Sequence, residues 1–163
     1  MEPKELGEMA SRGEDSMHQF KREVTHATTL AREIVAFANS GGGQIFIGVA
    51  DDGTVRGITG TQVLELNQLI AHAATQNVRP PLNVISENVP VPDGVVIVVT
   101  VPPGPGKPYQ DNEGSFWVKN GSDKRKVTAR EELQRMFQSA LLVHGDEVLV
   151  PGTSLDDVDD GVF

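Results

Sequence analysis

The chain has 163 residues, of which 38% are hydrophobic and 5% aromatic, and a formal net charge of −9 at pH 7. This length suits one domain with a sizeable core. The absence of cysteine excludes a disulfide framework and a thiolate metal site. No apolar stretch approaches the length of a membrane span, and the first twelve residues are too polar and acidic for a secretory signal. We therefore expect a cytoplasmic protein without a membrane partner.

The negative charge is concentrated near the carboxy-terminal end. Residues 145–163 contain six acidic side chains and no basic one, which leaves 14 basic and 17 acidic side chains in residues 1–144. Residues 1–144 are therefore close to neutral, and they can still form a local basic surface. The net charge therefore does not exclude a nucleic-acid partner.

The amino-terminal half is predicted to place a helix between two strands. Apolar residues recur at helical spacing over 27–39, and the three glycines at 41–43 would end that helix. An apolar strand follows, and Asp51-Asp52-Gly53 after it is typical of a hairpin turn. The expected elements are a flexible arm at 1–13, a short strand at 17–23, the helix, a strand at 44–49 and a return strand at 54–58.

The carboxy-terminal half is predicted to contain further strands and two helices. The apolar run at 95–99 is typical of a buried central strand, and the prolines and glycines at 102–108 require a loop. Thr128 and Glu131 have the spacing of a capping box. The expected elements are a helix that begins near Thr61 and ends before Pro80, strands at 83–89, 94–101 and 115–119, and a helix after Thr128.

This order of elements predicts an α+β fold with a mixed, largely antiparallel sheet and about three helices. Residues 14–144 would form one domain. Residues 145–163 hold few apolar side chains, so we expect an acidic tail or the start of a following region that has been cut off.

Basic side chains are the candidate contacts to phosphate. A run of basic residues, such as that at 124–126, is often part of a solvated loop that binds no partner, and this alternative stays open. Side-chain and backbone donors of the turn after residue 119 would add to the basic groups. The candidate nucleic-acid contacts are Lys21, Arg22, Arg79, Lys119, Asn120, Ser122, Lys124, Arg125 and Lys126.

The glycines at 41–43 do not read as a phosphate-binding loop, because a strand follows them and no lysine is present. The acidic residues Glu14, Asp51 and Asp52 allow two interpretations. They would form a metal-holding cluster if the fold brought them together, or they are solvated residues of a turn and of the amino-terminal segment.

Four segments, taken in order, resemble one family. They are residues 14–21, 36–53, 107–109, and 116–122 followed by Thr-Ala-Arg-Glu-Glu at 128–132. The chain is similar to the Schlafen AlbA-like domain of bacterial and archaeal DNA-binding regulators and of vertebrate Schlafens. The resemblance implies a nucleic-acid-binding α+β domain over 14–144. In prokaryotes such a domain often precedes a helicase-like or winged-helix segment.

Some Schlafens cleave RNA with three carboxylates, and the resemblance places those positions at Glu14, Gln19 and Asp51. The second position is an amide here, which cannot supply the negative charge that holds a divalent cation against phosphate. Gln19 therefore argues against enzymatic activity. If the chain were a nuclease, Glu14 and Asp51 would be the catalytic residues and the ligands of Mg²⁺ or Mn²⁺.

The sequence thus favours a nucleic-acid-binding module, such as a regulator or helicase-associated domain, that contacts the phosphate backbone. Two alternatives stay open: a divalent-metal-dependent nuclease of Schlafen type, and a protein-interaction or dimerisation domain that binds no nucleic acid. The choice between DNA and RNA, and the formation of a homodimer, are also left open.

Overall fold

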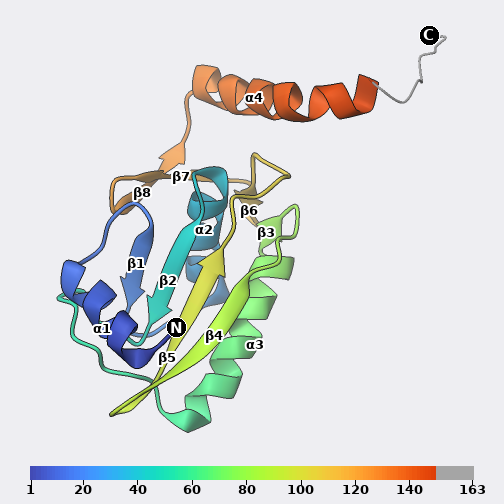
Figure 1. Ribbon diagram of the computed structural model, residues 1–163. Coiled ribbons are helices and arrows are strands. Elements are labelled where there is room, and N and C mark those ends of the chain that lie inside the picture. Colours follow the sequence, from blue (N-terminus) through green and yellow to red (C-terminus); the bar gives the residue numbers. More distant parts are fainter. Residues whose placement is uncertain (150–163) are drawn as a thin grey trace. The chain divides into compact units, whose positions relative to one another are not determined.

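The computed structural model describes residues 1–149, which form four helices and eight strands (Figure 1). Residues 1–105 and 109–127 make one compact unit, and residues 106–108 belong with the segment from Thr128 onward. The elements are α1 (Pro3–Arg12), β1 (His18–Lys21), α2 (Ala27–Asn39), β2 (Gly43–Ile47), α3 (Gly60–Gln76), β3 (Val78–Arg79), β4 (Ile85–Val91), β5 (Gly94–Val101), β6 (Gln110–Asp111), β7 (Phe116–Asn120), β8 (Asp123–Val127) and α4 (Arg130–Leu149).

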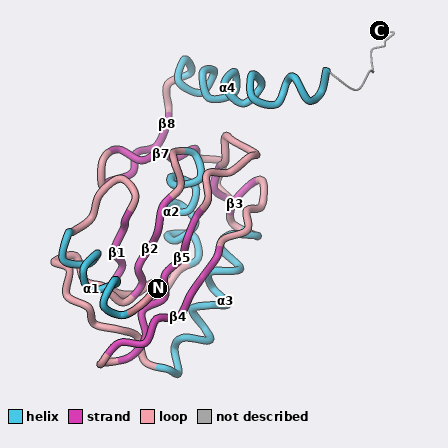
Figure 2. The backbone as a smooth tube through the Cα atoms, in the orientation of Figure 1, coloured by secondary structure: helices cyan, strands magenta, loops and turns pink. Residues whose placement is uncertain are grey.

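The main sheet has four strands in the order β1-β2-β5-β4 (Figure 2). Strands β1 and β2 are parallel, with Phe20 opposite Phe46, and α2 makes the crossover between them. The pairs β2–β5 and β5–β4 are antiparallel. The predicted α+β class with a mixed, largely antiparallel sheet is therefore confirmed, and β5 is the central strand that its apolar run indicates.

Helices cover both faces of this sheet (Figure 1). Alternate residues of each strand point to opposite faces, so neighbouring residues such as Ile45 and Phe46 belong to different layers. Helices α2 and α3 pack on one face, together with Ile45, Ile47, Ile97 and Val99. Helix α1 packs on the other face, together with Phe20, Phe46, Val96 and Val98.

The amino-terminal segment differs from the expected arm. Residues 3–12 form α1, in which Leu6 and Ala10 are buried one turn apart. Both side chains share one face of the helix and contribute to the core beside Phe20. The apolar stripe of this helix is so narrow among charged residues that the sequence pattern conceals it.

The return strand expected at 54–58 does not form as a continuous strand. Val55 and Ile58 each make only an isolated bridge, to Val49 and Val95. Gly57 lies between them with φ +76, a left-handed conformation that breaks regular pairing.

Among the helices of residues 1–149, none is long and apolar enough to cross a membrane.

The basic run at 124–126 lies in a strand rather than in a loop. Strand β8 pairs with β7 in a two-stranded antiparallel sheet, and Gly121 and Ser122 form the turn between them. Gly121 has φ +64, as the first residue of a tight two-residue hairpin turn requires. Because β8 has charged side chains on both faces, it lacks the apolar alternation that identifies a strand.

Candidate functional site

The β7–β8 hairpin is attached to the carboxy-terminal end of α2. The Asn39 amide nitrogen donates to the backbone oxygens of Tyr109 and Trp117, both at 2.9 Å, and its carbonyl oxygen accepts from the Tyr109 backbone N–H at 2.6 Å. The Ser40 hydroxyl oxygen accepts from the Lys119 backbone N–H at 3.0 Å. These bonds fix which side of the hairpin turns toward α2.

One face of the hairpin carries three lysines and a tryptophan. Trp117 is opposite Lys126 and Lys119 is opposite Lys124, so these four side chains leave the sheet on the same side. We call this set the basic hairpin face. Arg125 pairs with Val118 and therefore belongs to the other face, although it lies between two members of the set in sequence.

Cations surround the half-buried Trp117 ring. The ammonium of Lys126 lies 5.5 Å from the ring centroid, and Lys124 and the guanidinium of Arg32 on α2 each lie at 5.8 Å. These distances allow cation–π attraction. The ring is held in place by its own N–H, which donates to buried Asp111 at 2.9 Å.

A buried carboxylate lies beneath the lysines. Glu33 of α2 has a side chain only 3% exposed, and its Oε2 accepts from Lys124 at 2.8 Å and forms an ion pair with Lys21 at 3.1 Å. Burial alone would raise the pKa of Glu33, but the hydrogen bond from Lys124 and the charge of Lys21 hold that pKa below its usual value. One carboxylate between two lysines leaves a net positive charge at this point.

Lys119 is partly buried and makes several contacts. Its ammonium donates to Gln19 Oε1 and to the backbone oxygen of Ser122, both at 3.1 Å, and lies 4.6 Å from the centroid of the Phe37 ring. Burial lowers the pKa of Lys119, and the nearby charge of Glu33 opposes that shift. A phosphate at this position would favour the charged form of the lysine.

Gln19 links Lys119 to Glu14. Its amide nitrogen donates to Glu14 Oε2 at 2.6 Å, and the same oxygen accepts from the backbone N–H of Phe20 at 2.8 Å.

Asp51, the other predicted metal ligand, is exposed in the turn after β2. Within residues 1–149, no group of three or more histidine, aspartate or glutamate side chains is arranged to hold a metal ion. The assignment of Glu14 and Asp51 as metal ligands stays a prediction.

The remaining candidate contacts are dispersed. Arg22 follows β1 and lines a cavity beside α3, and Arg79 is exposed on β3, opposite Gln110. Asn120 and Ser122 are exposed at the tip of the hairpin. Tyr109, the last residue of the matched segment 107–109, is only 2% exposed and packs against Gly104, so it is part of the core.

Among the site residues that the sequence analysis did not identify are Arg32 and Glu33 of α2. They interrupt the apolar run of this helix, and the buried residues Ala31 and Ile34 lie on either side of the pair. A charged residue at a core position usually has a partner, so this position was a usable signal. Its partner Lys124 is 91 residues away in sequence and could not be inferred from spacing.

Gln19→Glu is expected to lower the free energy of unfolding by about 1–2 kcal/mol at neutral pH. The new carboxylate would replace the donor to Glu14 with a second negative charge, only partly offset by Lys119. Urea denaturation with and without Mg²⁺ tests both the loss and the metal alternative. If the two carboxylates can share a cation, Mg²⁺ should restore stability to this variant and not to Gln19→Ala, which loses the same hydrogen bond without adding charge. Equal stability with and without Mg²⁺ would contradict the metal assignment.

The geometry defines an α+β domain with helices on both faces of a mixed sheet and a basic hairpin held at the end of α2. A model of the family described as Schlafen, AlbA_2 matches residues 14–128 of this chain. The chain therefore belongs to the Schlafen AlbA_2 family. A comparison with curated proteins finds no match.

Solved structures with the same fold include proteins from two bacteria. The DIP2311 protein from Corynebacterium diphtheriae superimposes with a TM-score of 0.56 and 21% identity, over 74% of this chain and 24% of that one. The N-terminal domain of a protein from Nitrosomonas europaea, described as related to the ATP-dependent DNA helicase RecG, superimposes with a TM-score of 0.54 and 19% identity. That alignment covers 80% of this chain and 96% of the other. The chain thus spans about a quarter of the length of the DIP2311 protein.

Proposed function

We propose that this domain binds nucleic acid through the basic hairpin face and contacts mainly the phosphate backbone. The observation that carries the proposal is the gathering of Lys119, Lys124 and Lys126 with Trp117 on one face of the hairpin. Arg32 adds a further cation near the Trp117 ring, and Lys21 adds another beside Lys124 at Glu33. Phosphate contacts from lysine and arginine supply most of the affinity of non-specific binding. The name of the Nitrosomonas europaea neighbour, which refers to a DNA helicase, is consistent with a nucleic-acid partner.

The charge balance of this surface suits an anionic partner such as phosphate. Glu33 and Asp111 are buried and already have partners within the domain, and exposed Glu113 pairs with Arg32 at 3.2 Å. These acidic groups neutralise part of the cationic charge, and none of them forms an ion pair with Lys126 in residues 1–149. The exposed outer group of the cluster is Lys126, which makes it the first contact for a phosphate.

The nuclease alternative is less well supported. Glu14 is engaged by Gln19 and by the Phe20 backbone, and Gln19 carries no charge. This alternative would require Asp51 and a metal ion to complete the cluster, and the Mg²⁺ test of Gln19→Glu addresses that requirement.

Removing the charge of Lys126 is expected to weaken binding to single-stranded and double-stranded DNA and RNA, whatever their sequence. With about four neutralised phosphates on duplex DNA, the slope of log K against log salt should be about −3.6, and Lys126→Gln should reduce its magnitude by about 1. Fluorescence anisotropy at two or more salt concentrations measures both quantities. Lys126 is exposed and makes no contact with Glu33, so the substitution should not disturb the fold.

Arg125→Gln is the matched control, since it removes the same charge one residue away on the other face of the hairpin. Arg12→Gln, at the end of α1, controls for net charge alone. A loss of affinity that is equal in all three variants would show that overall charge governs binding, and would contradict the assignment to the basic hairpin face.

A further inference from the structure

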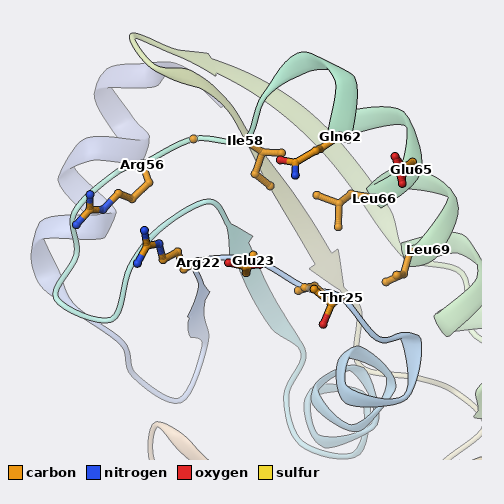
Figure 3. Close-up of a pocket in the computed structure, with 11 residues that line it drawn as sticks. Arg22, Glu23, Thr25, Arg56, Ile58, Gln62, Glu65, Leu66 and Leu69 are labelled. Carbon is orange, nitrogen blue, oxygen red and sulfur yellow. The ribbon is translucent and has the colours of Figure 1, made fainter.

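A separate cavity of about 420 Å³ lies beyond the end of β1 (Figure 3). The segment after β1, residues 56–58 and the first three turns of α3 line it. Its size falls in the range of small-molecule sites, about 300–1,000 Å³. It shares no residue with the basic hairpin face, so it needs its own explanation.

The irregular backbone at 56–58 creates this cavity. An added Cβ at Gly57 would lie 3.0 Å from Val91 and 3.2 Å from Gly94, so the chain runs close against the β4–β5 turn. Ile58 then pairs with Val95 and directs the chain into α3, which begins at Gly60. This route leaves Arg56 at the rim of the cavity instead of in a paired strand.

The lining is divided by chemical character. Figure 3 shows the guanidinium groups of Arg22 and Arg56 together at one end and the Glu65 carboxylate at the other. Ile58, Gln62 and Leu66 lie between these ends, and Glu23 lies beside Arg22. Arginines suit a phosphate, the apolar middle suits a ring, and carboxylates accept hydrogen bonds from hydroxyl or amino groups.

The two arginines are available for a ligand. Within residues 1–149, no carboxylate lies within 4.0 Å of either guanidinium, and neither guanidinium donates a hydrogen bond to another residue. The backbone N–H of Arg56 donates to the Gly48 oxygen at 2.8 Å, which leaves its side chain free to turn toward the cavity. The two guanidinium groups lie at the same end of the cavity and repel each other, and an anion bound between them would offset this repulsion. A planar guanidinium binds such an anion with two parallel hydrogen bonds.

We propose that this cavity binds a small phosphate monoester of the nucleoside monophosphate class. Arg22 and Arg56 hold the phosphate, the apolar side chains contact the base, and the carboxylates of Glu23 and Glu65 accept hydrogen bonds from ribose hydroxyls or a base amino group. The proposal is independent of nucleic-acid binding at the basic hairpin face.

Isothermal titration calorimetry with the whole chain, in the absence of nucleic acid, tests the proposal with three probes: adenosine 5′-monophosphate, adenosine and inorganic phosphate. The nucleotide should bind more tightly than either of its parts. Arg22→Gln and Arg56→Gln should each weaken nucleotide binding about tenfold or more, because each removes a charge-assisted hydrogen bond. Both side chains belong to exposed residues, so these variants should fold normally.

Two further variants make the test specific. Arg12→Gln removes an equal charge outside the cavity and should leave nucleotide binding unchanged. Gln62→Trp should fill the cavity from an exposed position and abolish nucleotide binding, while nucleic-acid binding at the basic hairpin face is retained. The proposal is overturned if the nucleotide binds no more tightly than inorganic phosphate, or if both arginine variants bind it as well as the native chain does.

Discussion

Replacing Lys21 and Lys124 together by methionine is expected to lower the free energy of unfolding by about 3–5 kcal/mol at neutral pH. Each lysine is one-quarter exposed, whereas the Glu33 side chain is 3% exposed and cannot turn to water. Its carboxylate would then be buried without either ion-pair partner. Urea denaturation, monitored by circular dichroism, measures the loss.

The pH dependence of stability identifies the cause of that loss. In the native chain the pKa of Glu33 is lowered, so its contribution is present above the ordinary value of 4.5 and is lost as the pH falls through the native pKa. In the double variant burial should raise this pKa instead, and stability should increase as the pH falls from neutral through the raised value. Mild acid above pH 4.5 should therefore stabilise the variant and leave the contribution of Glu33 to the native chain unchanged, whereas only stronger acid should remove that contribution from the native chain.

Lys126→Met is the control for this experiment, because Lys126 belongs to the same face and forms no ion pair with Glu33. It should cost well under 1 kcal/mol. Adding Glu33→Gln to the double variant should recover part of the lost stability, since it removes the buried charge. If the double variant is no less stable than Lys126→Met, the ion pairs of Glu33 with Lys21 and Lys124 do not stabilise the domain.

Gly42→Val is expected to lower the free energy of unfolding by about 3 kcal/mol or more. Gly42 has φ +80, and an added Cβ would lie 2.7 Å from the backbone oxygen of Val101 and 2.8 Å from Pro103 Cδ. A β-branched side chain would meet both backbone strain and a backbone atom that cannot move aside. Thermal and urea denaturation measure this effect, which is a large share of the ~5–15 kcal/mol that stabilise a domain.

The neighbouring Gly41→Val provides the comparison. Gly41 is exposed, has no atom within 4 Å of an added Cβ, and does not adopt a positive φ. Its substitution should change stability by about 0.5 kcal/mol or less. Equal effects at the two positions would contradict the interpretation that local geometry, rather than glycine content, determines the tolerance of this turn.

Elements with a clear apolar period could be predicted from the sequence. The predicted bounds of α2 match the observed 27–39, and β5 occupies the predicted 94–101. Helix α1 and strand β8 could not be predicted in this way, because their secondary structure depends on contacts with residues that are distant in the sequence. Leu6 is buried only because the sheet lies beneath it, and β8 is extended because β7 pairs with it.

The candidate site, too, could be predicted only in part from the sequence. Lys21, Lys119, Lys124 and Lys126 are among the residues that the sequence suggests, and the structure brings these four together. Charge alone could not separate them from Arg22, Arg79 and Arg125, which lie elsewhere. Strand register decides this separation, since Lys124 and Lys126 share a face while Arg125 does not. The run of charges does not contain that information.

The attachment of the hairpin to α2 has a consequence for how this surface can change. The hydrogen bonds described above from Asn39 and Ser40 join main-chain atoms of Tyr109, Trp117 and Lys119. Main-chain atoms are the same whatever side chain the residue carries. Side chains along the hairpin can therefore be exchanged while these anchoring bonds are kept. The end of α2 therefore fixes the position of the hairpin backbone, and substitutions along the hairpin can change the charge of this surface while the fold is kept.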